Sequence, residues 1–394
     1  MHFFKAPSDN STMKNDLDQA TIFDYAVVGA GIAGASVGFQ LADHGSVIVL
    51  ERESQPGYHS TGRSAAMFME SYGTPAIRAL TRASRAFYAH PPEGFTDHPL
   101  LTPRGVLYVA REGQQDLLAS TFNDLARTAN NLEQLDAAQA LALVPVLKAE
   151  GLLGGILEKD AQDIDVHALH QGYLRGMLRK GGLLRNHAEL VAAKHLDGVW
   201  TLTLADAATL QARHIVNAAG AWADVVAALC GVQAVGIEPR RRSAFTFAAP
   251  EGLRCHHWPT VVGIDESFYF KPDAGQLLGS PANADLVAAH DVVPEELDIA
   301  SGIHGIQEAT TLEIPRPTHT WAGLRAFVAD GDFVVGWDTD CAGFFWLAAQ
   351  GGYGIQTAAA VSELACALLR GQAVPAHLET QGVDTSALAP DRLR

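Results

Sequence analysis

The chain has 394 residues, and its 28 Lys and Arg against 44 Asp and Glu give a formal net charge of −16. This acidic balance argues against a general nucleic-acid-binding protein, because phosphate binding needs clustered positive charge. Hydrophobic residues make up 48% of the chain and charged residues 18%, with a mean hydropathy of +0.05. Such a composition excludes a disordered or fibrous protein and is typical of roughly two or three domains with a substantial core.

The four cysteines lie far apart and form no CxxC pair, so neither a disulfide framework nor a zinc ribbon is indicated. No apolar run reaches the length of a membrane span. The first twenty residues contain five charged side chains and no apolar stretch of signal-peptide length. We therefore expect a cytoplasmic protein with a frayed tail over residues 1–20.

The first strong pattern is a strand–helix–strand unit. Residues 25–28 form an apolar run typical of a buried strand, and residues 35–44 have helical character. Residues 47–50 predict a second buried strand. The short connections between these segments predict a compact βαβ unit.

Three glycines and one glutamate give this unit a function. Gly29 permits a tight turn after the strand, Gly31 lets a pyrophosphate approach the backbone, and Gly34 lets the helix pack closely. The helix N-terminus offers N–H groups and partial positive charge to phosphates. Glu51 ends the second strand, where a carboxylate accepts hydrogen bonds from a ribose. The pattern predicts a bound dinucleotide rather than an ordinary glycine turn.

Asp163 and Asp165 precede an expected helix that begins near Val166, where either carboxylate can act as the cap. His167 and His170 lie one helical turn apart in the same region, an arrangement that also occurs in metal sites. Capping and helix-surface roles are the favoured interpretation, and no metal is predicted.

The C-terminal half returns to strands over residues 183–224, and small residues near its end indicate a strand that passes close to a ligand. Residues 236–317 alternate apolar and polar side chains and predict a mostly antiparallel sheet. Gly351 and Gly352 then precede a helix that ends at Gly371. Backbone without side chains at this position lets a flat flavin ring lie against it, with the helix N-terminus stabilising a reduced ring.

Taken together, these features resemble the flavin-dependent D-amino-acid oxidase superfamily, and within it bacterial D-arginine dehydrogenase. The resemblance covers residues 23–394 and rests on several long segments in one order. These are VVGAGIAGAS (27–36), VLERESQPGYHSTGRSAA (49–66), VNAAGAW (216–222), DESFYFKPDAG (265–275), LLGSPANAD (277–285), WAGLRAFVADGD (321–332) and FFWLAAQGGYGIQT (344–357).

The resemblance implies non-covalent FAD. Carried over position by position, it places the pyrophosphate on the first glycines, the ribose on Glu51 and the flavin ring on the second glycine loop. The implied cofactor-binding residues are Gly29, Gly31, Ile32, Ala33, Gly34, Glu51, Arg52, Ser60, Thr61, Ser64, Ala66, Val191, Ala219, Gly220, Gly351, Gly352, Tyr353, Gly354, Ile355, Gln356 and Thr357.

For the substrate, the resemblance implies that Arg242 and Arg325 bind the α-carboxylate of an amino acid, assisted by Tyr72 and Tyr269. The carbonyl group of Gly352 would face the amine. A guanidinium group holds a carboxylate by two parallel bonds, which agrees with this assignment.

The departures from D-arginine dehydrogenase concern the side-chain pocket. The glutamate that holds the substrate guanidinium there is matched by Val106, and an active-site histidine is matched by Met67. Met69 and Thr260 replace a threonine and a methionine, while Val262 is retained. An unpaired guanidinium against this pocket would cost on the order of a few kcal/mol. We therefore expect an apolar or aromatic side chain rather than arginine.

We expect an α/β fold in which a Rossmann-type FAD-binding domain carries an inserted β-sheet-rich substrate domain. The predicted FAD-binding segments are residues 21–86, 150–235 and 320–394, and the substrate-binding segments are residues 87–149 and 236–319. The expected reaction is hydride transfer from the substrate Cα to flavin N5. Water then hydrolyses the imino acid to a 2-oxo acid and ammonia.

The electron acceptor is left open between oxygen, a quinone and another protein. Two other functions also stay open. One is oxidation of secondary amines such as sarcosine-like, N-substituted amino acids, and the other is flavin binding without catalysis.

Overall fold

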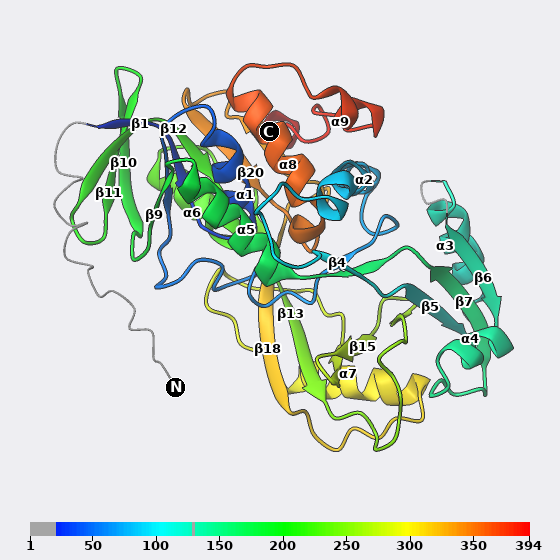
Figure 1. Cartoon of the computed structure of the whole chain (residues 1–394). Helices are drawn as coiled ribbons and strands as arrows, with labels where there is room; N and C mark the ends of the chain where they lie inside the picture. The colour runs from blue at the N-terminus through cyan, green and yellow to red at the C-terminus, as the bar shows by residue number, and fades with distance from the viewer. Residues whose placement is uncertain (1–20, 128–130) are drawn as a thin grey trace, which may run out of the picture.

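The computed structural model describes residues 21–127 and 131–394, and the tail predicted over residues 1–20 lies outside the described residues. Two large sheets and one small sheet organise the chain, with the first sheet at the upper left of Figure 1 and the second at the lower right. Helices alternate with parallel strands in the first sheet, while the second is mostly antiparallel. This architecture confirms the predicted α/β class.

The strands of the first sheet are β1 (Ile22–Val28), β2 (Val47–Leu50), β9 (Leu183–Arg185), β10 (Leu190–Leu196), β11 (Val199–Leu204), β12 (Thr209–Asn217), β19 (Val334–Trp337) and β20 (Phe344–Ala348). β1 lies between β12 and β2 and runs parallel to both, and β9 continues the parallel order beyond β2. The carboxyl end of β12 pairs in parallel with β20. β10 and β11 form an antiparallel hairpin against the start of β12, and β19 pairs antiparallel with β20.

Helices α1 (Ile32–Leu41), α2 (Pro75–Ala89), α5 (Val166–Arg179) and α8 (Gly354–Leu369) pack together beside this sheet, and α1 contacts both α5 and α8. α1 connects β1 to β2, which confirms the predicted strand–helix–strand unit. α5 begins at Val166 as predicted, and the Asp165 carboxylate caps it by accepting the N–H of Ala168 at 2.8 Å. Asp163 is not part of this cap.

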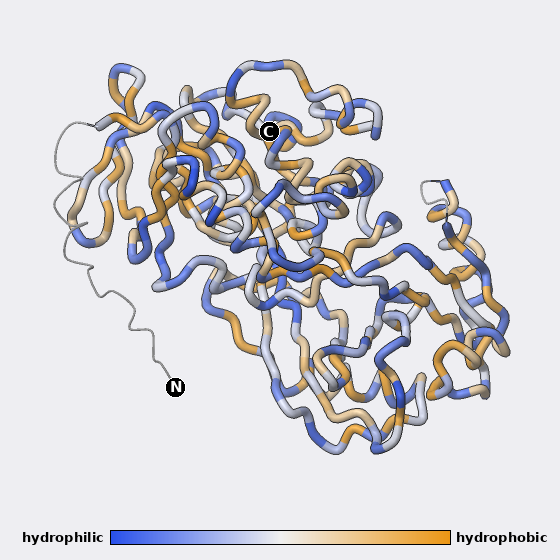
Figure 2. The backbone as a smooth tube through the Cα atoms, in the orientation of Figure 1, coloured by the Kyte–Doolittle hydropathy of each residue, from blue (hydrophilic) through white to orange (hydrophobic). Residues whose placement is uncertain are grey.

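Both faces of the first sheet are covered, which explains why its central strands read as continuous apolar runs. Val27 and Val49 lie in one core cluster with α1 and α8, whereas Val28 and Ile48 lie in a second cluster. Figure 2 shows these hydrophobic stretches concentrated around the first sheet. Two separate apolar layers therefore hold the nucleotide-type sheet.

The second sheet contains β5 (Val106–Arg111), β6 (Leu132–Asp136), β7 (Leu152–Glu158), β13 (Glu238–Phe247), β14 (Thr260–Gly263), β15 (Tyr269–Asp273), β16 (Gln276–Ser280), β17 (Asp285–Leu286) and β18 (His319–Phe327). β18 pairs along β13, whose other edge pairs with β16 and β17. The order then continues from β16 through β15, β14, β5 and β7 to β6. Only the β14–β5 pair is parallel within this described sheet, which confirms the expected antiparallel pattern.

Two strands of this sheet fall in ranges that the sequence groups with the FAD-binding segments. β7 pairs with β5 and β6, and β18 pairs with β13. Hydrogen bonding to these partners draws both strands into the second sheet. A further helix, α7 (Glu296–Ala309), packs on β13, β15 and β16, although the sequence pattern predicts only strands in this region.

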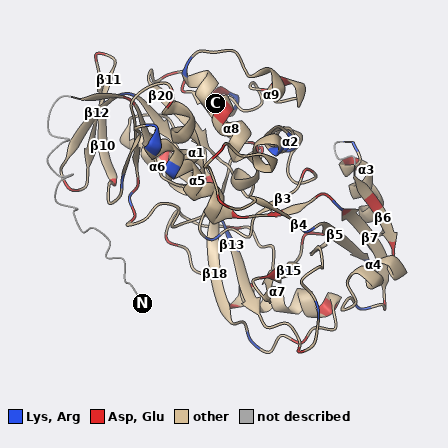
Figure 3. Cartoon of the chain, in the orientation of Figure 1, with Lys and Arg blue, Asp and Glu red and all other residues tan. Residues whose placement is uncertain are grey.

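The small sheet lies between the large ones and consists of β3 (Met67–Phe68), β8 (Gln162–Ile164) and β4 (Leu101–Pro103), with β8 in the middle. The remaining elements are α3 (Gln115–Leu125), α4 (Ala137–Leu143), α6 (Ala223–Leu229), α9 (Ala376–Thr380) and the 3-10 turns Gly220–Trp222 and Pro390–Leu393. Acidic side chains are spread over α3, β6 and α7 (Figure 3). In the described ranges no helix has both the length and the apolar character to cross a bilayer.

Candidate active site

A cavity of about 340 Å³ extends from the carboxyl ends of β1 and β12 to the inner face of the second sheet. It brings together most residues that the sequence predicts for the site, although they come from both large sheets and the small one. The predicted residues that line it are Gly29, Gly31, Ile32, Ala33, Glu51, Arg52, Ser60, Thr61, Ser64, Ala66, Met67, Met69, Tyr72, Ala219, Gly220, Arg242, Thr260, Val262, Tyr269, Arg325, Gly351, Gly352, Gly354, Ile355 and Gln356.

Five other predicted residues do not line the cavity, and one of them, Gly34, lies beneath the first glycine turn. Val106 is fully buried in a core cluster, and Val191 is 43% exposed on β10. Tyr353 packs its ring against Tyr72, with the ring centroids 4.8 Å apart. The Thr357 hydroxyl donates to the Tyr353 carbonyl oxygen at 2.9 Å within α8. These side chains are placed to support the site or to lie beyond it.

The first glycine loop is close to neighbouring backbone at two points. Gly29 has φ +103°, and a Cβ added there would lie 2.5 Å from the Ala218 carbonyl oxygen. A Cβ on Gly34, a predicted residue beneath the turn, would lie 1.8 Å from the Gly29 carbonyl oxygen. Real Cβ atoms do not approach backbone this closely, so both positions require glycine. The turn therefore leaves bare backbone and the start of α1 facing the cavity.

Glu51 is 7% exposed, and both its oxygens are fixed by backbone groups. Oε2 accepts the N–H of Ala30 at 3.0 Å, and Oε1 accepts the N–H of Glu53 at 3.0 Å. A carboxylate has about four acceptor sites, so capacity is left for ribose hydroxyl groups. His170 Nε2 donates to the Ala30 carbonyl oxygen at 2.9 Å, and burial lowers the pKa of this histidine. A neutral His170 thus anchors the same turn from the opposite side.

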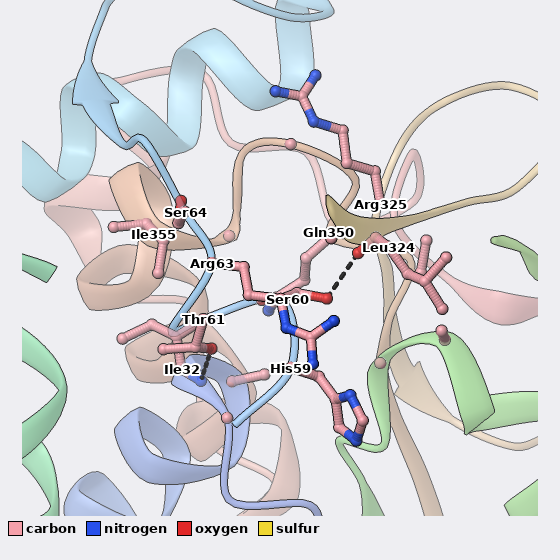
Figure 4. A pocket seen from close by; sticks show the side chains of 18 of the residues that line it. Ile32, His59, Ser60, Thr61, Arg63, Ser64, Leu324, Arg325, Gln350 and Ile355 are labelled. Atoms are coloured by element: carbon pink, nitrogen blue, oxygen red, sulfur yellow. Dashed lines mark hydrogen bonds between the residues drawn. The ribbon is translucent and has the colours of Figure 1, made fainter. Parts of the chain in front are cut away.

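Residues 57–66 form a loop that bridges the two halves of the cavity. The Thr61 hydroxyl accepts the N–H of Ile32 at the start of α1 at 3.0 Å, and the Ser60 hydroxyl donates to the Leu324 carbonyl oxygen at 2.6 Å. Figure 4 shows Thr61 beside Ile32 on one side of the pocket and Arg325 on the other, with Ser60 between them. The loop thereby fixes the distance between the helix N-terminus and β18.

The second glycine loop packs against the strand that carries Arg325. The Gly351 N–H donates to the Ala326 carbonyl oxygen at 2.7 Å, and Gly351 has φ +51°. A Cβ on Gly352 would lie 2.8 Å from Arg325 Cζ, so the guanidinium group packs directly on this backbone. The same loop leads into α8 at Gly354. Bare peptide and a cation therefore share one wall of the cavity.

Arg242 on β13 and Arg325 on β18 are the charged groups of this wall. Arg242 Nε donates to the Asn283 carbonyl oxygen at 2.6 Å, and Arg325 Nη1 donates to Tyr72 Oη at 3.1 Å. Neither guanidinium forms a salt bridge with a carboxylate in residues 21–127 or 131–394. Two adjacent cations that form no salt bridge among the described residues offer a binding site for an anion.

The pKa directions agree with this picture. Burial and then the neighbouring charge of Arg325 lower the pKa of Arg242. Burial also opposes the charge of Arg325, but its pKa is raised because Tyr72 and Tyr269 outweigh that effect. Tyr269 lies on β15 and faces the same cavity. A carboxylate placed between the two guanidinium groups would relieve their repulsion.

A row of side chains on the second sheet lines the rest of the cavity. Val262 on β14 pairs with Tyr108 on β5 and with Tyr269 on β15, so the three side chains share one face. Thr260, two residues before Val262, lies on the same face and donates its hydroxyl to Met67 Sδ at 2.8 Å. Met67 is 8% exposed and Met69 9% exposed. This part of the cavity is largely apolar.

Sequence reasoning missed several residues that line the cavity. Tyr108, Glu266 and Lys271 add polar groups on the side of the second sheet. Lys271 Nζ donates to Asp163 Oδ1 at 2.7 Å and Arg104 Nε donates to Asp163 Oδ2 at 2.7 Å, so Asp163 pairs with two cations instead of capping α5. The alternation of side chains along β15 places Lys271 on the same face as Tyr269 and was the available signal.

Comparison with known proteins identifies this architecture. Residues 24–368 match the model of the family described as DAO, FAD dependent oxidoreductase. The chain belongs to this family. It is an FAD-dependent oxidoreductase, and its relatives by sequence and fold include enzymes named for small amino acids.

Glycine oxidase from Geobacillus kaustophilus has a similar fold, with a TM-score of 0.79 at 20% identity, over 90% of this chain and 96% of that one. L-proline dehydrogenase from P. horikoshii has a TM-score of 0.78 at 17% identity, over 95% of this chain and 98% of that one. Mitochondrial dimethylglycine dehydrogenase from Mus musculus is 28% identical over 142 residues. This match covers 35% of this chain and only 16% of that longer protein.

The described residues fit an FAD. The glycine turn and the start of α1 offer backbone N–H groups for the pyrophosphate, and Glu51 offers acceptors for a ribose. Bare backbone at Gly351 and Gly352 leaves room for a flat ring beside Arg325. The positions of the two glycine loops in one cavity account for the cofactor of this family.

Proposed function

We propose that the enzyme oxidatively deaminates a free amino acid. One observation carries this proposal: Arg242 and Arg325 face the same cavity without a carboxylate partner among the described residues, and Arg325 packs on Gly352. An anionic group bound there lies beside the bare backbone that accommodates the flavin ring. The α-carboxylate of an amino acid is such a group, and the Cα bonded to it would lie beside the same backbone.

The roles of the side chains follow from their contacts. Arg242 and Arg325 bind the carboxylate, and Tyr72, which accepts a hydrogen bond from Arg325, fixes the orientation of that guanidinium. Tyr269 adds a hydroxyl from the second sheet, and the Gly352 carbonyl accepts a hydrogen bond from the amine. When bound, FAD would supply the two-electron oxidation of the substrate Cα–N bond. Water hydrolyses the resulting imino acid to a 2-oxo acid and ammonia.

The side chain of the substrate is apolar or aromatic and belongs to a D-amino acid. Met67, Met69 and Val262 give the cavity an apolar wall that suits such a group. Methionine sulfur also contacts aromatic rings favourably. The motifs shared with D-arginine dehydrogenase support the D-configuration.

A secondary amine is the second candidate substrate. The relatives and similar structures are named for glycine, proline and dimethylglycine, which carry a primary, a secondary and a tertiary amine. The same carboxylate site would serve all three, because it does not contact the nitrogen substituents. N-methylated amino acids therefore belong in any substrate screen.

An anaerobic screen tests the proposal. The FAD-loaded protein is mixed with D-amino acids, their L-enantiomers and N-methylated analogues, and bleaching of the flavin absorbance is followed. We expect reduction by D-amino acids with apolar or aromatic side chains and little reduction by D-arginine. Faster reduction by N-methylated substrates would favour the second candidate. A flavin that no amino acid bleaches would contradict both and leave a flavin-binding protein without this activity.

A further inference from the structure

Tyr108 is a cavity residue whose hydroxyl group has incomplete hydrogen bonding among the described residues. Tyr108 on β5 is 8% exposed and lines the cavity. Its Oη lies 3.4 Å from Ser71 Oγ, and among the described residues it makes no shorter hydrogen bond. Hydroxyl–hydroxyl bonds are normally about 2.7–2.8 Å long. Because a buried hydroxyl without a good partner is unfavourable, a ligand group that completes its bonding gains affinity.

Ser71 and Glu158 set the direction of this bonding. Both side chains are buried, at 2% and 4% exposure. Glu158 Oε1 accepts the N–H of Glu70 at 2.9 Å, and Oε2 accepts the Ser71 hydroxyl through a short hydrogen bond. The single hydroxyl proton of Ser71 is thereby committed to Glu158, so Ser71 Oγ can only accept from Tyr108. Tyr108 Oη is then left as an acceptor toward the cavity.

The register of the second sheet places Tyr108 two strands away from Tyr269. Tyr108 and Tyr269 flank Val262 on neighbouring strands. Two strand spacings put their Cα atoms about 10 Å apart. An amino acid with an aromatic side chain spans such a distance from its carboxylate to the far edge of its ring. Met67 and Met69 provide the apolar surface along that path.

We propose that Tyr108 is a specificity-determining residue that accepts a hydrogen bond from the far end of an aromatic side chain. The preferred substrates are amino acids that carry a phenol or an indole N–H rather than a plain phenyl ring. Ser71 and Glu158 are positioning residues that orient the Tyr108 hydroxyl. This inference rests on the proposed function, because that function places the carboxylate between Arg242 and Arg325.

The test compares tyrosine with phenylalanine, in the enantiomer that reduces the flavin, on the FAD-loaded enzyme. Tyr108→Phe removes the acceptor and leaves the ring in place. We expect kcat/KM for tyrosine relative to phenylalanine to fall by about 3- to 10-fold, the range for one neutral hydrogen bond. Tyr173→Phe is the matched control, since Tyr173 is fully buried on α5, its hydroxyl has no partner within residues 21–127 and 131–394, and it does not line the cavity. Its ratio should equal that of the wild type.

An unchanged ratio in Tyr108→Phe would overturn the proposal, whether both kcat/KM values stay the same or both fall equally. A binding measurement distinguishes failure of the Tyr108 proposal from failure of the proposed function. Tyrosine and phenylalanine each perturb the FAD spectrum on binding, and titration of that change gives the ratio of their Kd values without turnover. A protein that oxidises neither amino acid but shows the Tyr108-dependent Kd ratio keeps the site and loses the proposed function. An enzyme that oxidises both amino acids with a ratio unaffected by Tyr108→Phe keeps the proposed function and loses the proposed role of Tyr108.

The positioning role has its own signature in the pH profile. Burial raises the pKa of Glu158, and the titratable groups facing it are Tyr108 and Glu70, which is itself paired with Arg85. A protonated Glu158 donates to Ser71, which then donates to Tyr108, so the Tyr108 hydroxyl proton turns toward the cavity in place of the acceptor. The wild-type preference for tryptophan over phenylalanine should therefore fall on acidification, because an indole N–H can only donate, and Ser71→Ala should abolish that pH dependence. A preference with the same pH profile in both proteins would refute this role.

Discussion

Replacement of Arg325 by alanine is the most direct test of the carboxylate site. Arg325 packs on Gly352 and donates to Tyr72 Oη at 3.1 Å, so its guanidinium group is held in place before a substrate binds. Hydrogen bonds to a charged group are worth about 1.5–3 kcal/mol each, and a guanidinium makes two of them to a carboxylate. Their loss amounts to about 3–6 kcal/mol, or roughly 10²- to 10⁴-fold in kcat/KM.

The assay is anaerobic rapid mixing, with the rate of flavin reduction measured against substrate concentration. Phenylalanine is compared with phenethylamine, which lacks the carboxylate. In the wild type the amino acid should react far faster, and in Arg325→Ala that advantage should collapse while the slow rate with the amine stays the same. Arg213→Ala, on an exposed arginine of β12 outside the cavity, is the control. Equal losses for both compounds, or a wild-type rate with the amino acid, would refute carboxylate binding by Arg325.

Three further predictions address the cofactor turn, the core and the pH dependence of stability. Gly34→Ala puts a Cβ 1.8 Å from the Gly29 carbonyl oxygen, so the purified variant should lack FAD, and a normal ratio of flavin to protein absorbance would contradict this. Val106→Glu places a second buried carboxylate opposite Glu158, so it should lower the unfolding free energy by about 2–4 kcal/mol, and Glu158→Gln should restore part of it. An unchanged Tm would contradict that pairing. Burial lowers the pKa of His170 below its ordinary value of 6.5, so on acidification the unfolded chain is protonated before the folded one. The free energy of unfolding, measured with denaturant, should therefore decrease as the pH falls below 6.5. This decrease should be smaller in His170→Gln.

The cofactor end of the cavity could be predicted because its constraints are local. Gly29 and Gly34 are separated by five positions, and the pattern of strand, glycines and helix reports their contacts directly. Gly351 and Gly352 likewise follow one strand and precede one helix. At these positions the backbone itself is the binding surface. A motif of glycines at fixed spacing therefore carries the geometry with it.

The side-chain pocket could not be predicted in the same way, because its neighbours are distant in the sequence. Glu158 lies 87 residues from Ser71, and Ser71 lies 37 from Tyr108. Position-by-position likeness gave Val106 a place in the pocket, but this side chain is fully buried and does not line the cavity, whereas Tyr108 does. α7 was not predicted because Gly302 weakens the helix propensity of its segment. In the fold this glycine lets the helix contact Phe245, which is distant in the sequence.

The polar groups of the cavity define its ligand more sharply than its apolar walls do. Arg242 and Arg325 repel each other unless an anion lies between them, whereas Lys271 is already paired with Asp163. At the other end Tyr108 has an acceptor that no described residue satisfies. A ligand that completes both ends carries a carboxylate, an apolar middle and a terminal hydrogen-bond donor. Since each unsatisfied end penalises a ligand that lacks the matching group, the two ends together select by length as well as by chemistry.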